Sequence, residues 1–245
     1  MKDSTARELL EKVKDDYDNI ANEFDQTRQH DWKEFNLFLK YINDDDKIAD
    51  LGCGNGRFYE FLRKNRKIRE PLKNTGSQQN SQKLLRYTGI DNNKKLLNMA
   101  KSKLKSDKNA KFLEGDLLKT GLEKSSIDMV AAIASFHHLP GKEIRKKSLL
   151  EINRILKNKG KLIISVWNLF QTKYKKFIWK ARIRRILSLG KYDWRDTFIP
   201  WGKSGTKRYY YAFKANELEK LLKENGFKII EKFSANNLVF ICEKQ

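Results

Sequence analysis

A short apolar run that ends in a glycine-rich turn constrains this chain more than any other feature. Residues 47–51 are followed at once by Gly52, Gly54 and Gly56, and Asp50 stands directly before them. Glycines at a strand end let the backbone approach a ligand closely, because they carry no Cβ atom. The G-x-G-x-G spacing differs from the G-x-G-x-x-G of dinucleotide enzymes, which place pyrophosphate at a helix amino end. The preceding carboxylate favours a ligand that carries an ammonium group.

The rest of the chain repeats the same alternation of strand and helix. The pattern predicts an α/β fold with a doubly wound, mostly parallel, seven-stranded sheet that an antiparallel hairpin closes. Strand-like apolar runs lie at residues 47–51, 87–90, 110–113, 127–134, 161–166, 227–233 and 238–242. Helical patterns lie at residues 5–40, with a polar break at 25–30, and at 57–63, 94–105, 144–156 and 216–225.

Three segments stand apart from this rhythm. With 245 residues the chain is long enough for one α/β domain, and we expect residues 1–245 to form a single domain. Within it we expect an N-terminal helical region at 1–44. Residues 64–85 are polar and read as a surface insertion, and residues 168–213 are basic and aromatic and read as a second insertion.

The net charge of +21 points to a polyanionic partner, with a merely lysine-rich surface as the alternative. Residues 171–208 hold 12 Lys and Arg against two acids, with aromatic residues between them. That composition suits RNA, whereas an amphipathic helix on a membrane surface ranks second. Two distant cysteines exclude a disulfide framework, and we expect a cytoplasmic protein without a membrane span or signal peptide.

Two further acidic residues follow predicted strands. Asp91 ends the second strand, where a carboxylate can accept hydrogen bonds from both hydroxyls of a ribose. Asp116 follows the third strand and is placed to meet an adenine amino group. Taken one by one, these residues and the glycines could be ordinary turn glycines and helix-capping aspartates. For that interpretation to be correct, the glycine loop, Asp91 and Asp116 must each have such a local role independently of the others.

The ordered set from the glycine loop to residues 127–138 resembles the class I S-adenosylmethionine-dependent methyltransferases, which have a Rossmann-like fold. The resemblance covers roughly residues 45–165 and the closing hairpin. It implies S-adenosylmethionine as the cofactor. It also implies the cofactor-binding residues Asp50, Gly52, Gly54, Gly56, Asp91, Asp116 and Leu117.

A finer resemblance links blocks outside this core to the tRNA wobble-uridine carboxymethyl methyltransferases. Tyr211 and Ala212 depart from that family's pattern, and so does the 64–85 insertion. The resemblance implies methyl transfer to the carboxylate of 5-carboxymethyluridine in the tRNA anticodon loop. It also makes a small activator protein, which eukaryotic members need, a possible partner. The matching blocks are Tyr17–Ala21, Phe24–Arg28 with Trp32, His137-His138, Trp167, Ile199–Trp201, Arg208–Tyr210 and Glu217-Leu218.

The chemistry of this substrate selects candidate residues within those blocks. A carboxylate is already an anion, so the protein must orient it with cations and exclude water. Arg28, His137 and Arg208 are the catalytic candidates, because arginine presents a planar fork to a carboxylate. Each could also have a simpler role: a helix-end contact for Arg28, a buried loop imidazole for His137 and a phosphate contact for Arg208.

Aromatic residues could hold the base that carries the carboxylate. Trp167, Tyr209 and Tyr210 are the candidates for stacking on or framing a flipped-out uracil, although they could also be core aromatics. Two other functions stay open from the sequence. One is a small-molecule methyltransferase whose basic surface is incidental, and the other is an RNA-binding protein with a vestigial cofactor pocket.

Overall fold

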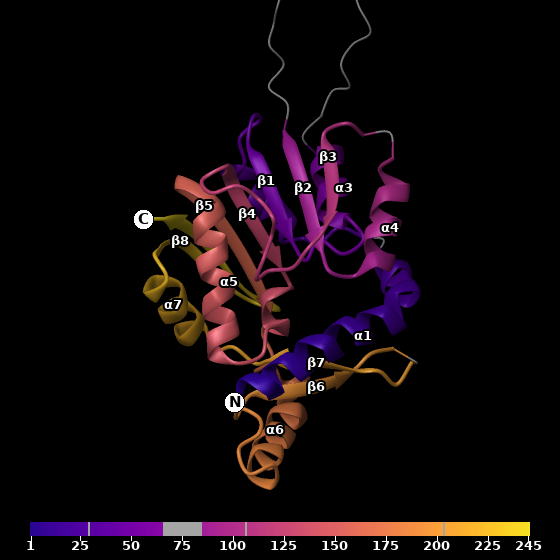
Figure 1. Ribbon diagram of the computed structural model, residues 1–245, viewed down its shortest axis with the longest axis vertical. Coiled ribbons are helices and arrows are strands. Elements are labelled where there is room, and N and C mark those ends of the chain that lie inside the picture. The colour runs from indigo at the N-terminus through magenta and orange to yellow at the C-terminus, as the bar shows by residue number, and fades with distance from the viewer. Residues whose placement is uncertain (29, 66–84, 106, 203) are drawn as a thin grey trace, which may run out of the picture.

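Seven strands form one sheet in the order β3-β2-β1-β4-β5-β9-β8. The computed structural model describes residues 1–28, 30–65, 85–105, 107–202 and 204–245. Strands β1 to β5 pair in parallel, and β9 runs antiparallel to both β5 and β8, so the predicted fold with its closing hairpin is confirmed (Figure 1). The strands are β1 (Lys47–Leu51), β2 (Arg86–Asp91), β3 (Ala110–Glu114), β4 (Ile127–Ile133), β5 (Leu156–Trp167), β8 (Phe227–Ser234) and β9 (Asn237–Lys244).

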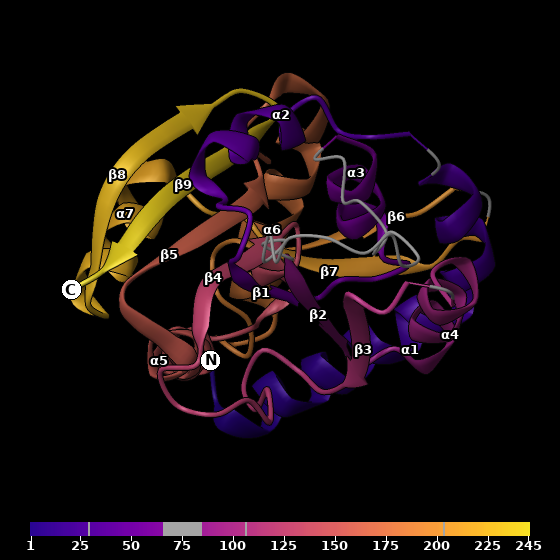
Figure 2. The same cartoon turned by 90° about the horizontal axis from the view of Figure 1, so that it is seen from above.

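Helices cover both faces of this sheet (Figure 2). Side chains of β4 alternate between the faces: Val130 and Ala132 join the cluster under α5 and α7, and Met129 and Ala131 join the cluster under α2, α3 and α4. A strand buried on both sides reads as a nearly continuous apolar run, which is why β4 was predictable. The helices are α2 (Phe35–Phe38), η1 (Leu39–Tyr41), α3 (Arg57–Asn65), α4 (Lys94–Lys103), η2 (Phe136–His138), α5 (Lys142–Ile155) and α7 (Ala215–Glu224).

The first helix, α1 (Asp3–Thr27), crosses the end of the sheet where the parallel strands finish (Figure 1). Leu9, Ile20 and Ala21 of α1 are buried, while its other side chains are mostly exposed or half-buried. It packs against α4 on one side and against β7 of the second insertion on the other. This helix therefore joins the sheet to the insertion.

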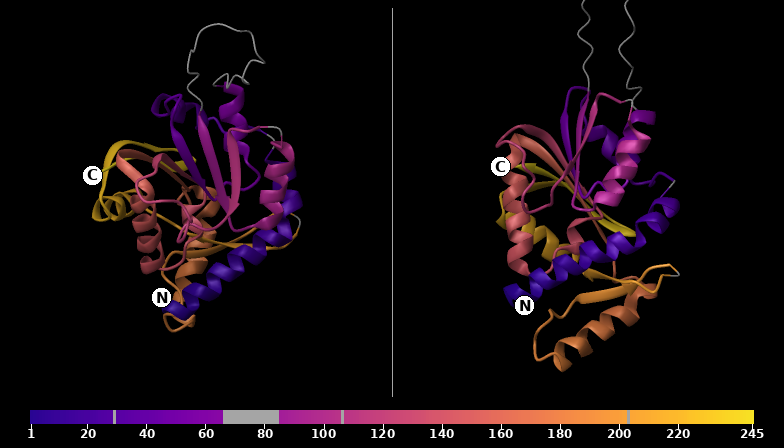
Figure 3. Two further views of the ribbon diagram at one scale, coloured as in Figure 1. Left: turned by 45° about the horizontal axis from the view of Figure 1, so that its top comes forward. Right: turned by 45° about the vertical axis from the view of Figure 1, so that its right-hand side comes forward.

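The second insertion forms a layer of its own beyond α1. It contains η3 (Thr172–Tyr174), α6 (Lys175–Leu187), β6 (Asp196–Pro200) and β7 (Lys207–Tyr211). The antiparallel pair β6-β7 is separate from the main sheet, and α6 lies on the side of that pair away from α1 (Figure 3). Most of the first insertion, residues 66–84, lies outside the described residues, and the single-domain organisation stays a prediction.

No helix within the described ranges has both the length and the apolar character that crossing a membrane requires.

Candidate functional site

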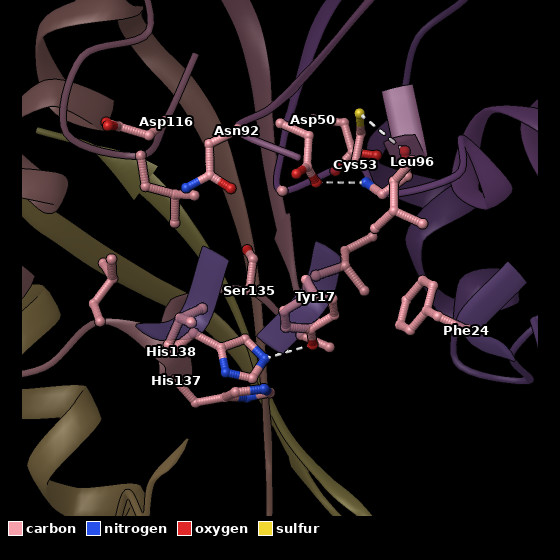
Figure 4. Close-up of a pocket in the computed structure, with 18 of the residues that line it drawn as sticks. Tyr17, Phe24, Asp50, Cys53, Asn92, Leu96, Asp116, Ser135, His137 and His138 are labelled. Carbon is pink, nitrogen blue, oxygen red and sulfur yellow. Dashed lines mark hydrogen bonds between the residues drawn. The ribbon is translucent and has the colours of Figure 1, made fainter. Parts of the chain in front are cut away.

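A cavity of about 230 Å³ lies at the carboxyl ends of β1, β2 and β4, under α1 (Figure 4). The strand order reverses there, because β1 pairs with β2 on one side and with β4 on the other. Open α/β sheets bind ligands at such switch points. Side chains from α1, from the turns after these strands and from β7 complete the lining.

The glycine loop forms one wall of this cavity in a backbone conformation that requires glycine. Gly52 has φ +78°, and a Cβ atom there would lie 2.4 Å from Cβ of Ser135. Gly54, at φ +55°, donates its N–H to the Asp91 carboxylate at 2.8 Å. Gly56 is not among the residues that line the cavity, and its role as a cofactor contact stays a prediction. Its Cα faces α4, where a Cβ atom would lie 3.2 Å from Ala100, so this glycine allows close packing of the helix.

Asp50 brings a buried carboxyl group to the base of the cavity. Its exposed fraction is 2%, and the Tyr87 hydroxyl donates a hydrogen bond to it. Burial raises the pKa of Asp50, the bond from Tyr87 lowers it and the nearby Asp91 raises it, and together they place this pKa at about 7. A carboxyl group in this state gains from a cationic ligand that pairs with its charge. The ammonium group expected from the sequence is such a ligand.

Asp91 and Asp116 also line the cavity, as does Leu117. The Asp91 carboxylate accepts hydrogen bonds from the N–H groups of Gly54 and Asn93, at 2.8 and 2.9 Å. Asp116 caps its own turn by accepting the Leu118 N–H at 2.6 Å. The two carboxylates stand at the ends of neighbouring strands, as predicted, and these contacts fix their orientation.

Helix α1 is tied to this loop by side-chain hydrogen bonds. The Asn55 amide donates to Asp25 at 2.7 Å, and the Asn93 amide donates to Asp18 at 2.7 Å. Lys103 of α4 also pairs with Asp25. These bonds hold α1 across the loop, so that Tyr17, Phe24 and Arg28 line the cavity.

Arg208 is a buried cation at the opposite end of the cavity. Its exposed fraction is 2%, its Nη1 donates to the Tyr17 hydroxyl at 2.9 Å, and its guanidinium lies 3.9 Å from the centre of the Trp201 ring. Among the described residues its Nε–H has no hydrogen-bond partner, and no carboxylate forms an ion pair with it. Asp16 interacts with this charge electrostatically without pairing with it directly. A buried cation with no direct ion pair is costly, so this position suits an anionic ligand.

The two histidines beside Arg208 are neutral with defined tautomers. The Tyr209 carbonyl can only accept, so Nδ1 of His138 donates to it at 2.7 Å, and Nε2 accepts the Tyr17 hydroxyl at 2.8 Å (Figure 4). Nδ1 of His137 accepts the Trp167 N–H at 3.1 Å, which leaves its proton on Nε2. Burial lowers the pKa of both imidazoles and the charge of Arg208 adds to this effect, so that the pKa of His138 lies at about 3.

Most residues predicted for the acceptor side meet at this end of the cavity. Arg28, His137, Trp167 and Tyr210 all line it together with Arg208, and the Trp167 and Tyr210 rings stack with centroids 5.0 Å apart. Arg28 also contacts the Trp201 ring, at 4.9 Å from its centre.

Tyr209 is the exception. Successive side chains of β7 point to opposite faces, so Tyr209 points away from the cavity that Arg208 and Tyr210 line. It is fully buried, and its hydroxyl donates to Asp196 at 2.7 Å. Its placement in substrate binding is therefore corrected to a core position.

Sequence reasoning assigned no role to Tyr17 or Trp201, although both contact Arg208. Tyr17 follows the apolar spacing of α1, so it reads as a core position. Its place in the matching block Tyr17–Ala21 and its polar hydroxyl on that face were the available signals. Trp201 belongs to the matching block Ile199–Trp201, but nothing in the sequence indicated that its ring packs on Arg208.

Known proteins share this architecture. Residues 49–164 match the family model described as a methyltransferase domain. A protein of Encephalitozoon cuniculi that is named as a candidate methyltransferase is 28% identical over 231 residues, which is 93% of each chain. The tRNA (carboxymethyluridine(34)-5-O)-methyltransferase of Xenopus tropicalis is 29% identical over 170 residues. That alignment covers 69% of this chain and 22% of the relative, so this chain spans less than a quarter of that protein.

Solved structures agree on the fold. An S-adenosylmethionine-dependent methyltransferase from Methanosarcina mazei superimposes with a TM-score of 0.66 at 20% identity, over 85% of this chain and 96% of that one. A candidate methyltransferase of Haloferax volcanii, solved in complex with the Trm112 methyltransferase activator, gives a TM-score of 0.64 at 17% identity, over 95% and 97%.

The cavity itself fits S-adenosylmethionine. Buried Asp50 suits the ammonium group of the cofactor, Asp91 stands where a ribose would be held, and Gly52 lets the loop pack closely against Ser135. Residues 49–164 therefore match a methyltransferase domain and have the class I methyltransferase fold, and the cofactor of this domain is S-adenosylmethionine.

Proposed function

We propose that this protein is a tRNA methyltransferase that converts the carboxylate of 5-carboxymethyluridine, at the anticodon wobble position, into its methyl ester. The observation that carries the proposal is Arg208, a buried cation at the cavity with an Nε–H that has no partner in the described part of the chain. A guanidinium in this state matches a planar carboxylate in charge and geometry. The name of the Xenopus tropicalis relative supports the same acceptor.

The neutral histidines fit an acceptor that needs no deprotonation. S-adenosylmethionine, when bound, supplies an electrophilic methyl group on a sulfonium sulfur. A carboxylate is already ionised, so no side chain has to act as a general base. With Nδ1 of His137 occupied by the Trp167 N–H, its Nε2–H is left as a hydrogen-bond donor for one carboxylate oxygen.

The remaining residues of the proposal orient the acceptor and exclude water. Arg208 and Arg28 hold the carboxylate, and both guanidiniums pack on the Trp201 ring. Trp167 and Tyr210 stack on one another and frame the uracil of an extruded nucleotide. The cofactor is held by Asp50, Gly52, Gly54, Asp91, Asp116 and Leu117, which line the other end of the cavity.

A small activator protein belongs to the same proposal. The Haloferax volcanii protein that superimposes on 95% of this chain was solved together with the Trm112 activator. We expect a homologous activator to increase the yield or activity of this enzyme when the two are produced together.

The test is methyl transfer from labelled S-adenosylmethionine to tRNA that carries unesterified 5-carboxymethyluridine at the wobble position. We expect incorporation into an ester that mild alkali removes. Absence of transfer, with and without the activator, refutes the proposal. Transfer to a small carboxylic acid but not to tRNA would identify a small-molecule methyltransferase, and RNA binding without transfer to any acceptor would indicate a vestigial cofactor pocket.

Arg208→Met tests the residue that carries the proposal, and Arg145→Met is its matched control. Arg145 is also buried, at 4% exposure, but it stacks on Tyr211 at 3.7 Å and does not line the cavity. We expect Arg208→Met to abolish transfer while cofactor affinity stays within a few-fold. We expect Arg145→Met to lower stability and leave transfer nearly unchanged. Equal loss of transfer in both variants contradicts the role of Arg208.

A further inference from the structure

The outer face of α6 concentrates positive charge around one exposed tryptophan. The helix contains six Lys and Arg residues and no acidic residue. Trp179 is 63% exposed, and Lys175, Lys176 and Arg182 lie four before, three before and three after it, so they share its face of the helix. These three cations and Lys180 are all exposed. We call Lys175, Lys176, Trp179, Lys180 and Arg182 the α6 face.

This charge is not neutralised within the described parts of the protein. Two cations of the second insertion form side-chain ion pairs, Lys191 with Glu8 and Arg195 with Glu217. Among the described residues, no ion pair involves a side chain of α6. Ile178 and Ala181 of the helix are buried against the β6-β7 layer, whereas Ile186 and Leu187 near its carboxyl end are exposed. The α6 face is therefore available to a partner, and that partner must be anionic.

The α6 face begins beside the wall of the cavity. Trp167, which lines the cavity, stacks with Tyr174 at 6.3 Å between ring centroids, and Tyr174 directly precedes α6. Figure 3 shows α6 extending along the outer side of β6 and β7 from there. A helix of 13 residues is about 20 Å long, which is enough to contact several consecutive nucleotides.

We infer that the α6 face binds the sugar-phosphate backbone of the RNA that flanks the reacting nucleotide, with Trp179 stacking on one unpaired base. The inference rests on the proposed function, because it takes the acceptor to be part of an RNA. Lysine and arginine neutralise phosphates, and an indole stacks on any base, so this surface binds RNA without reading its sequence. A membrane surface fits less well. Ile186 and Leu187 are exposed at the end of α6, but the α6 face itself presents one indole among four cations, and membrane binding needs a continuous apolar stripe.

The test replaces the four cations of the α6 face with glutamine. The matched control replaces Lys108, Lys111, Lys124 and Lys159, which are exposed near the amino ends of β3, β4 and β5, at the opposite edge of the sheet. Both variants lose the same charge. Binding of a fluorescent anticodon stem-loop RNA is measured by anisotropy as salt is varied. Because each contact with single-stranded RNA contributes about 0.7 to the salt slope, we expect the α6 variant to reduce the slope by about 3.

Trp179→Ala separates stacking from charge. We expect it to weaken RNA binding about tenfold and to leave the salt slope unchanged, because stacking releases no counterions. Under turnover, the α6 variant should raise KM for tRNA while kcat and cofactor affinity stay at the wild-type values.

Two outcomes overturn the inference. One is equal RNA affinity of the α6 variant and the control variant. The other is binding of the wild-type protein to vesicles of anionic phospholipid, lost in the α6 variant, without measurable RNA binding. RNA binding that depends on the α6 face but leads to no methyl transfer would instead refute the proposed function and leave this inference standing.

Discussion

Tyr17→Phe removes one oxygen atom that joins α1 to the acceptor end of the cavity. That oxygen accepts a hydrogen bond from Nη1 of Arg208 at 2.9 Å and donates one to Nε2 of His138 at 2.8 Å. The ring remains in the variant, and with it the edge contacts to Phe24 and His138, at 5.5 and 5.2 Å between centroids. The substitution therefore tests the polar junction and leaves the packing in place.

The structure sets the size of the expected effect. A hydrogen bond to a charged group contributes about 1.5–3 kcal/mol to stability and a neutral one about 0.5–1.5 kcal/mol. The variant should thus lose about 2–4 kcal/mol, which for a chain of this length lowers Tm by roughly 5–15 °C. Arg208 then loses its one hydrogen bond to a described side chain. We expect kcat/KM for tRNA to fall about 10–100-fold, equivalent to about 1.4–2.8 kcal/mol.

The assay is single-turnover methyl transfer to tRNA, with cofactor affinity measured separately by titration. Tyr59→Phe is the control, because Tyr59 is fully buried, donates to Asp107 at 2.8 Å and does not line the cavity. It should lower Tm and leave transfer unchanged. If transfer by Tyr17→Phe stays within twofold of transfer by Tyr59→Phe, Tyr17 does not orient Arg208 and the reasoning fails.

Three further predictions concern the cofactor end. The folded-state pKa of Asp50, about 7, lies above its ordinary value of 3.8, so the folded protein holds a proton that the unfolded chain releases between about pH 4 and 7. Stability of the cofactor-free protein must then fall as pH rises through this window. Asp50→Asn should remove that fall and be more stable at pH 8, by up to about 4 kcal/mol, but not at pH 4, as thermal denaturation at both pH values will show. Gly52→Ala should abolish cofactor binding in calorimetry, because its Cβ atom would lie 2.4 Å from Cβ of Ser135 at a positive φ, and unchanged affinity would contradict this geometry. Asn55→Ala breaks the bond to Asp25 and should speed cofactor dissociation in stopped-flow measurements, whereas an unchanged rate would mean that α1 does not hold the loop.

The fold was readable from the sequence because its central strands are buried on both faces. Such a strand needs apolar side chains at almost every position, as residues 127–134 have, and the strand-end residues Asp50 and Asp91 follow once the strands are placed. The β6-β7 pair was not predicted. β6 (Asp196–Pro200) contains an acidic residue, an aromatic residue and a proline, and β7 (Lys207–Tyr211) has two basic residues followed by three tyrosines, so no period stands out. In the same region, the orientation of Tyr209 depends on the register of β7, which composition does not reveal.

The acceptor end was only partly predictable for a related reason. Arg28, His137 and Arg208 come from three distant segments, and the sequence does not show that Tyr17 and Trp201 connect them. The hydrogen bond from Tyr17 to His138 spans 121 residues of chain. Such contacts arise from the packing of α1 across the sheet. The apolar pattern of this helix predicts which face packs, but it does not show that the Tyr17 hydroxyl on that face forms hydrogen bonds in the cavity.

Helix α1 contacts residues at both ends of the cavity. Asp18 and Asp25 contact residues that follow β2 and β1, and Tyr17 contacts Arg208 on β7. Binding of one ligand contributes free energy that orders α1. The second ligand then binds to a helix that is already ordered and does not have to supply that free energy. For the proposed tRNA substrate we therefore expect the two binding events to be thermodynamically linked. The linkage is reciprocal: the factor by which cofactor tightens the binding of tRNA equals the factor by which tRNA tightens the binding of cofactor.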